Sequence, residues 1–261
     1  MQLSLFTDSI HPALAPTNLT SSLHPIHRWV NFIAGYSPEF VSVCIREAGL
    51  SSGDIILDPF GGLGTTPVQS LLDGFSCITC EANPYFADLA TAKCQAALGA
   101  INPDEVFSTL HQLSPYKGEL EDIYSVDALT FLKKLIPETE LRVLVNARLK
   151  GLEITPDNKF FYRLVVSVIL ELTSKSQTDG IYKAPTTKKK SNSFKDALLR
   201  VESQIMEDLD LITKKQNISY DLFYLCQAFD LLTIGVFVQY LRYCTRVFYD
   251  LLMFFGSHGC T

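Results

Sequence analysis

The chain has 261 residues, of which 47% are hydrophobic and 19% are charged, and its formal net charge at pH 7 is −6. This composition supports a sizeable buried core and excludes an intrinsically disordered chain. The acidic balance argues against a general nucleic-acid coat, which would be strongly basic, so any nucleic-acid contact would need a local basic face.

The cysteine content and the apolar runs indicate a cytoplasmic protein. Seven cysteines form an odd set with irregular spacing, which is typical of free thiols in a reducing compartment. The first six residues lack the basic and apolar regions of a signal peptide. The uncharged run 231–241 has eleven residues, too few to span a bilayer.

The first element expected after the N-terminus is a helix. Residues 1–22 are rich in Ser, Thr and Pro and are expected to form an irregular arm. Ser37 suits a helix N-cap and Pro38 suits the first helical position, so we predict a helix from Ser37 to about Ala48.

Two strand–helix units follow. The apolar run 55–58 ends in an acid, a glycine-rich turn comes next, and a helix is predicted over 67–72. A second strand, 75–81, also ends in an acid and leads into a helix over about 84–98. This order indicates an α/β fold with a doubly wound, Rossmann-like sheet, in which ligands bind where the strands end.

The glycine-rich turn carries the most specific motif in the chain. It is neither the dinucleotide pattern nor a phosphate-binding loop, because its glycines are at 61, 62 and 64 and no lysine follows. It resembles the S-adenosylmethionine loop of the DNA amino-methyltransferases, which methylate adenine N6 or cytosine N4. The alternative is an ordinary strand-to-helix turn. The resemblance is carried by the nine positions Asp58-Pro59-Phe60-x-Gly62-x-Gly64-Thr65-Thr66.

The resemblance implies which residues bind the cofactor. Glu81, which closes the second strand, would accept hydrogen bonds from the ribose hydroxyls, as opposed to being a solvated strand-end acid. Phe32, Pro38 and Phe40 are candidates for the pocket wall or for plain core. The cofactor-binding set implied by the family is Asp58, Pro59, Phe60, Gly62, Gly64, Thr65, Thr66, Glu81 and Phe40.

The α/β rhythm stops after the second unit, and residues 104–218 are expected to be largely helical. The segment 160–172 fits a buried helix or a strand, and its length favours a helix. The loop 175–191 is the one feature that suits nucleic acid, because lysines and hydroxyls contact phosphates. A solvated charged loop is the alternative. The DNA-binding candidates are Lys183, Lys188, Lys189 and Lys190.

The catalytic loop of the resembled family is absent. That loop reads Asp/Ser/Asn-Pro-Pro-aromatic, and the sequence contains no Pro-Pro and no proline after Pro185. No catalytic residue therefore follows from the resemblance. Residues 219–261 form an aromatic-rich tail whose lead-in, Tyr220-Asp221-Leu222, resembles the approach to the catalytic strand. The tail is either a C-terminal helical element or, as we favour, non-native sequence after a frameshift or truncation.

Together these features predict a member or fragment of the DNA amino-methyltransferase family. Its cofactor would be S-adenosylmethionine, and its partners would be double-stranded DNA and a cognate restriction endonuclease. The alternatives are an inactive remnant that binds the cofactor and an RNA or small-molecule methyltransferase. The expected parts are the arm 1–22, the Rossmann-like cofactor part 23–103, a helical DNA-recognition region 104–218, and the tail 219–261.

Overall fold

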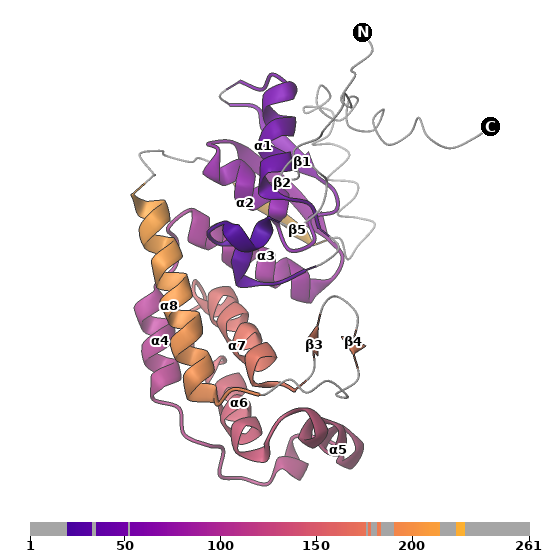
Figure 1. Cartoon of the computed structure of the whole chain (residues 1–261), viewed down its shortest axis with the longest axis vertical. Helices are drawn as coiled ribbons and strands as arrows, with labels where there is room; N and C mark the ends of the chain where they lie inside the picture. The colour runs from indigo at the N-terminus through magenta and orange to yellow at the C-terminus, as the bar shows by residue number, and fades with distance from the viewer. Residues whose placement is uncertain are drawn as a thin grey trace, which may run out of the picture. The chain divides into compact units, whose positions relative to one another are not determined.

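The computed structural model describes residues 20–32, 35–51, 53–175, 177–178, 182–183, 191–214 and 223–227. It describes only the backbone of residues 177–178, 182–183 and 223–227. The chain divides into two units (Figure 1). The first contains residues 1–24, 35–98 and 217–261, and the second contains 25–34 and 99–216. Each unit is described by itself.

The first unit is a parallel sheet with helices packed against it. The strand order is β1-β2-β5, and both strand pairs are parallel. Because β1 and β2 are parallel, Asp58 and Glu81 both lie at the carboxyl end of their strands. The elements are η2 (Ser21–Leu23), α1 (Pro38–Glu47), β1 (Ile55–Asp58), α2 (Thr65–Leu72), β2 (Ser76–Glu81), α3 (Pro84–Ala97) and β5 (Phe223–Gln227).

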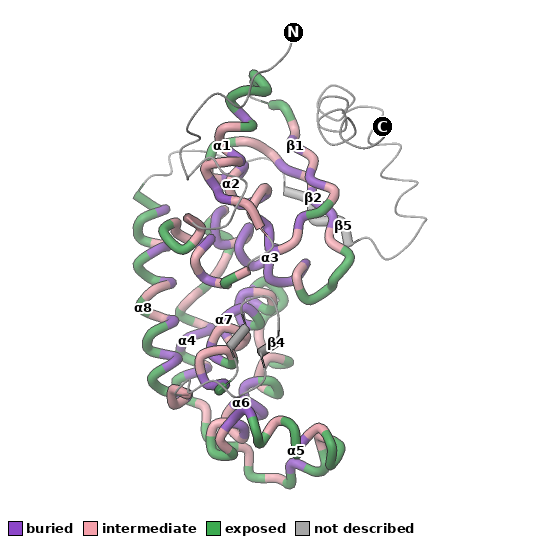
Figure 2. The backbone as a smooth tube through the Cα atoms, turned by 45° about the vertical axis from the view of Figure 1, so that its right-hand side comes forward, coloured by how far each residue is buried: buried purple, intermediate pink, exposed green. Residues whose placement is uncertain are grey.

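Helix α1 begins where the sequence predicts. The side chain of Ser37 accepts a hydrogen bond from the backbone N–H of Phe40, and Pro38 occupies the first turn. The helix packs on the sheet through Val41 and Ile45, which form a core cluster with Ile56 of β1 and Cys77 of β2. Helix α3 is buried along most of its length (Figure 2).

Two boundaries and the type of one element in this unit differ from the sequence prediction. Helix α2 begins at Thr65, because Gly64 has a left-handed backbone conformation that lets the turn close directly into the helix. Strand β2 begins at Ser76, one residue later than predicted. In the tail, residues 223–227 form a strand paired with β2, so the expectation of a helical element is wrong there. The rest of the tail lies outside the described residues.

The described part of the second unit is mainly helical, in agreement with the prediction for the region 104–218. The segment 160–172, which fitted a helix or a strand, is helical. The described elements are η3 (His27–Trp29), α4 (Pro103–His111), η4 (Leu120–Asp122), α5 (Val126–Leu135), α6 (Glu138–Lys150), α7 (Lys159–Thr173) and α8 (Phe194–Thr213), with a small antiparallel pair β3 (Gln177–Thr178) and β4 (Tyr182–Lys183).

A buried aspartate fixes the N-terminal segment within the second unit. Asp208 of α8 is fully buried and accepts hydrogen bonds from the backbone N–H of Ile26 at 2.9 Å and from the indole N–H of Trp29 at 2.8 Å. The Arg28 guanidinium donates to the same carboxylate. Ile26 has a φ of +64°, which is rare for a β-branched residue, so these contacts stabilise a strained backbone.

None of the helices in the described part of the chain combines the length and the apolar character that a bilayer span requires.

Candidate cofactor-binding site

The two predicted acids lie at the same edge of the sheet. Asp58 pairs in register with Thr79, so Glu81 ends the neighbouring strand two residues beyond that pair. The glycine loop connects the end of β1 to α2 at this edge. In an open α/β sheet this edge is the usual location of ligands.

Asp58 is fixed by two donors, of which the sequence predicted neither. Its side chain is 9% exposed. Oδ1 accepts the backbone N–H of Phe60 at 2.9 Å, and Oδ2 accepts the Tyr36 hydroxyl at 3.1 Å. The Tyr36 hydroxyl is also hydrogen-bonded to the hydroxyl of Thr66 at the start of α2.

Tyr36 is a protonated phenol at any ordinary pH. Burial raises the pKa of Tyr36, and the charge of Asp58 raises it further, because both disfavour a phenolate. The hydroxyl is therefore available as a donor to the carboxylate. In this way Tyr36 joins the end of β1 to the start of α2.

Glu81 contacts the glycine loop and the start of α3. Oε2 accepts the backbone N–H of Gly62 at 2.7 Å, and Oε1 accepts the backbone N–H of Asn83 at 2.7 Å. The two oxygens of a carboxylate offer about four acceptor positions, so Glu81 keeps capacity for ligand hydroxyls. Asn83 caps α3 by accepting the backbone N–H of Tyr85.

Two glycines are required for steric reasons. A Cβ on Gly61 would lie 2.1 Å from Oγ1 of Thr79, because the loop crosses β2 closely and its N–H donates to the Cys80 carbonyl at 2.7 Å. Gly64 has a φ of +82°, and a Cβ there would lie 3.0 Å from the Ala90 side chain. The loop is thus packed against both β2 and α3.

The other side of the loop is open. A Cβ on Gly62 would meet no atom within 4 Å. Phe60 is 86% exposed. The loop therefore presents an open backbone surface and an aromatic side chain to a ligand. They lie between two carboxylates that can accept hydrogen bonds from amines and hydroxyls. This donor and acceptor set fits S-adenosylmethionine, which carries an amino group and a ribose diol.

The three residues predicted for the pocket wall lie in different surroundings. Phe40 is half-buried, and its ring lies against that of Tyr36 with the centroids 5.8 Å apart. Pro38 is buried at the start of α1. Phe32 belongs to the second unit. The ring of Phe40 therefore contacts Tyr36, and Tyr36 in turn is hydrogen-bonded to Asp58.

A lysine that the sequence patterns did not single out contacts the loop from α3. The Lys93 ammonium is buried and donates to the Leu63 carbonyl at 3.0 Å. Helical spacing could have revealed it, because Lys93 falls three and four residues after the buried residues Ala90 and Leu89. A charged residue at a position of the apolar face is a signal of a specific contact.

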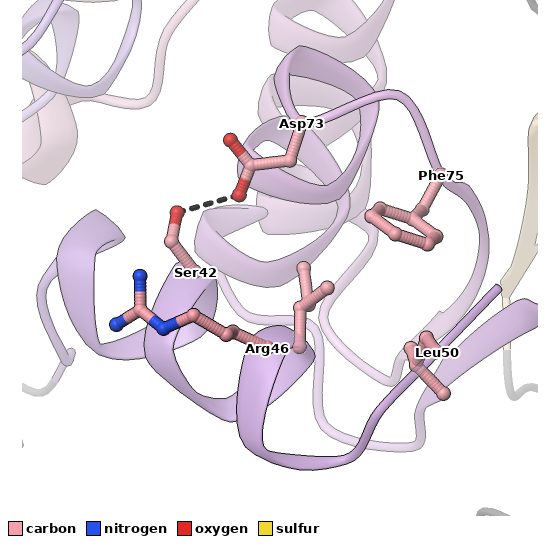
Figure 3. A pocket seen from close by; sticks show the side chains of 6 residues that line it. Ser42, Arg46, Leu50, Asp73 and Phe75 are labelled. Atoms are coloured by element: carbon pink, nitrogen blue, oxygen red, sulfur yellow. Dashed lines mark hydrogen bonds between the residues drawn. The ribbon is translucent and has the colours of Figure 1, made fainter. Parts of the chain in front are cut away.

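A separate hollow of about 380 Å³ is lined by residues of α1 and the turn after it and by residues between α2 and β2 (Figure 3). Its wall includes Phe75, which precedes β2, whereas Glu81 ends that strand, so the hollow is at the opposite end of the sheet. A hydrogen bond from Ser42 to Asp73 crosses its rim. The six lining residues are Ser42, Ile45, Arg46, Leu50, Asp73 and Phe75.

The predicted DNA contacts are not part of the described site. Lys188, Lys189 and Lys190 lie outside the described residues. Lys183 lies in β4, where the structure describes its backbone only. Among the described residues, no group of three or more His, Cys, Asp and Glu side chains is placed to hold a metal ion.

Comparison with known proteins gives one informative match. Over 162 residues the chain is 30% identical to "Type II methyltransferase M.BsoBI" from Geobacillus stearothermophilus. The match covers 60% of this chain and 31% of that protein, so the chain matches less than a third of its relative's length. No family model and no solved structure matches the chain. The similarity supports a relationship to the Type II methyltransferases.

Proposed function

We propose that this chain binds S-adenosylmethionine through the glycine loop and serves in site-specific methylation of DNA at adenine N6 or cytosine N4. The observation that carries the proposal is the placement of Asp58 and Glu81 at the ends of adjacent parallel strands, on either side of a loop with an open face. The relationship to a Type II methyltransferase supports the same activity. We also propose a cytoplasmic location and a cognate restriction endonuclease as a partner.

Each residue of the site has a distinct role in this proposal. Asp58 and Glu81 accept hydrogen bonds from the cofactor's amino group and ribose hydroxyls, and the exposed ring of Phe60 covers an apolar part. Gly62 leaves the loop backbone open to the cofactor, and Gly64 lets the loop pack against α3. When bound, the cofactor supplies an electrophilic methyl group.

Calorimetry with S-adenosylhomocysteine tests the cofactor site. The wild-type chain is expected to bind, and Asp58→Ala is expected to weaken binding by about tenfold or more, because a hydrogen bond to a charged group contributes roughly 1.5–3 kcal/mol. Asp73→Ala is the matched control, since Asp73 is an exposed carboxylate at the opposite end of the same sheet. Absence of binding by the wild-type chain, or equal affinities of the two variants, would overturn the assignment.

The DNA part of the proposal rests on the basic loop. Lys183, Lys188, Lys189 and Lys190 would contact phosphates, which position a protein on DNA without reading its sequence. Replacing residues 188–190 by alanine is expected to weaken DNA binding at low salt. It is also expected to reduce the slope of log affinity against log salt by about 0.9 for each phosphate that is no longer neutralised. An unchanged slope would contradict the role of these lysines.

A second candidate function is a catalytically inactive protein that binds the cofactor and DNA. This candidate is motivated by the family's catalytic Pro-Pro dipeptide, which these 261 residues do not contain. Transfer of a tritiated methyl group to unmodified DNA decides between the two, since transfer above background excludes the inactive protein. Including RNA as a competing substrate in the same assay tests the third candidate, an RNA methyltransferase.

A further inference from the structure

Helix α3 contains a buried charge that the proposed roles do not use. Lys93 is 2% exposed, and its neighbours on the helix are small or apolar: Ala90, Ala92, Ala96 and Ala97 are all buried. Placing an ammonium in such surroundings costs free energy unless it has hydrogen-bond partners. Burial accordingly lowers the pKa of Lys93 to about 8. A long apolar residue would fill the same space without this cost.

The hydrogen bond that Lys93 makes is directed at the glycine loop. Its Nζ lies 3.0 Å from the carbonyl oxygen of Leu63, the residue between Gly62 and Gly64. This hydrogen bond is buried, so the carbonyl faces the interior of the unit. On either side of it, Gly62 donates to Glu81 and Gly64 donates to the Gly61 carbonyl, both at 2.7 Å. Lys93 thus binds the loop at a point between two other fixed positions.

We propose that Lys93 is a positioning residue for the cofactor site, which fixes the Leu63 carbonyl and so keeps the loop backbone in the conformation that receives S-adenosylmethionine. The inference rests on the proposed function for its ligand, whereas the contact with the loop is independent of it. If the lysine served packing alone, a long apolar side chain would replace it without any effect on the loop.

A role in positioning the loop and a role in packing alone predict different cofactor affinities for Lys93→Met. The substitution leaves the Leu63 carbonyl without this donor, but it also removes the desolvation cost of the buried ammonium, and the two effects offset each other. We therefore expect K93M to unfold at the same urea concentration as the wild type or at a higher one. We also expect its affinity for S-adenosylhomocysteine to fall about tenfold, because the released carbonyl lets the loop relax.

Cys94→Ala is the matched control. Cys94 is the next residue of α3 and is fully buried, and no contact between it and the loop is described. C94A is expected to lose stability, since it leaves a small cavity. It should keep the wild-type affinity. We therefore expect stability to fall in C94A but not in K93M, and affinity to fall in K93M but not in C94A.

A spectroscopic measurement tests the loop directly. In protein labelled with ¹⁵N-glycine, the amide resonances of Gly62 and Gly64 are expected to shift in K93M and to stay unchanged in C94A. Wild-type affinity of K93M together with unshifted glycine resonances would overturn the proposal. If the wild type itself fails to bind S-adenosylhomocysteine, the proposed function fails, and the glycine resonances still decide whether Lys93 positions the loop.

A second variant covers the case in which K93M does not fold. Lys93→Gln keeps a polar N–H donor but is one bond shorter, so its amide does not reach the Leu63 carbonyl without movement of the helix or loop. K93Q is expected to show the same weakened affinity and the same glycine shifts. Wild-type values of both in K93Q would equally overturn the proposal.

Discussion

Removal of the Tyr36 hydroxyl is the sharpest test of how the site is organised. Tyr36→Phe deletes one oxygen atom and leaves the ring against Phe40. The change removes a hydrogen bond of 3.1 Å to the carboxylate of Asp58, and it also deprives the Thr66 hydroxyl of its partner. A hydrogen bond to a charged acceptor contributes about 1.5–3 kcal/mol, so we expect the free energy of unfolding to fall by that amount.

Tyr162→Phe provides an unusually close control. Tyr162 is buried, whereas Tyr36 is half-buried, and the Tyr162 hydroxyl donates to the Ala147 carbonyl at 2.7 Å within the second unit. The acceptor is neutral, so the expected loss of stability is about 0.5–1.5 kcal/mol. Both variants are destabilised, but only Y36F removes a donor to Asp58. We therefore expect Y36F to bind S-adenosylhomocysteine about tenfold more weakly than Y162F does.

Urea unfolding measures the stability of the two variants, and calorimetry measures their affinity for S-adenosylhomocysteine. Equal affinities of Y36F and Y162F would refute the reasoning, because the hydroxyl would then stabilise the fold without shaping the site. A thermodynamic cycle adds a second check. In an Asp58→Ala background, Y36F should cause little further loss of affinity, since its effect is transmitted through that carboxylate. Additive losses would show that Tyr36 acts by another route.

Three further predictions concern the loop, the buried lysine and the buried aspartate. Gly61→Ala is expected to destabilise by about 1–3 kcal/mol through its clash with Thr79, and Thr79→Ala should recover part of that loss in a double-mutant cycle, where additivity would contradict the close approach. The pKa of Lys93 is about 8 in the folded chain and 10.5 for an ordinary lysine, so the unfolded chain binds more protons between these values and stability must rise with pH there. Between pH 7 and 9 the wild type should gain about 1 kcal/mol relative to K93M, and a constant difference would show that the group does not titrate in this range. Asp208→Ala is expected to cost about 3–5 kcal/mol, because it leaves the buried donors unpaired, whereas Asp210→Ala on the exposed side of the same helix should cost less than about 1 kcal/mol in the same urea titration.

Local sequence patterns predicted the framework of the first unit because the relevant forces are local. Ser37 followed by Pro38 is a capping signal that acts within one turn, and α1 begins there. The acids at 58 and 81 end apolar runs, and the parallel pairing brings them to one edge. Helix α2 begins two residues earlier than predicted, because the left-handed Gly64 allows the helix to start immediately after the turn.

The contacts that shape the site could not be predicted from these patterns, since they join distant positions. Tyr36 reaches Asp58 across 22 residues, and Lys93 reaches Leu63 across 30. An aromatic residue before a helix and a lysine within one are both common, and neither indicates its partner. The positive φ of Ile26 is likewise stabilised by its contact with Asp208, which lies 182 residues away.

These long-range contacts bear on how the loop would bind a cofactor. A loop that must be ordered on binding loses affinity through conformational entropy, at roughly 1–2 kcal/mol for each residue fixed. Here the loop is already fixed at three points by side chains outside it: Tyr36 through Asp58 and Thr66, Glu81 through Gly62, and Lys93 through Leu63. Much of that entropy is therefore lost on folding. Each substitution at these points should weaken cofactor binding even where the substituted group does not touch the cofactor.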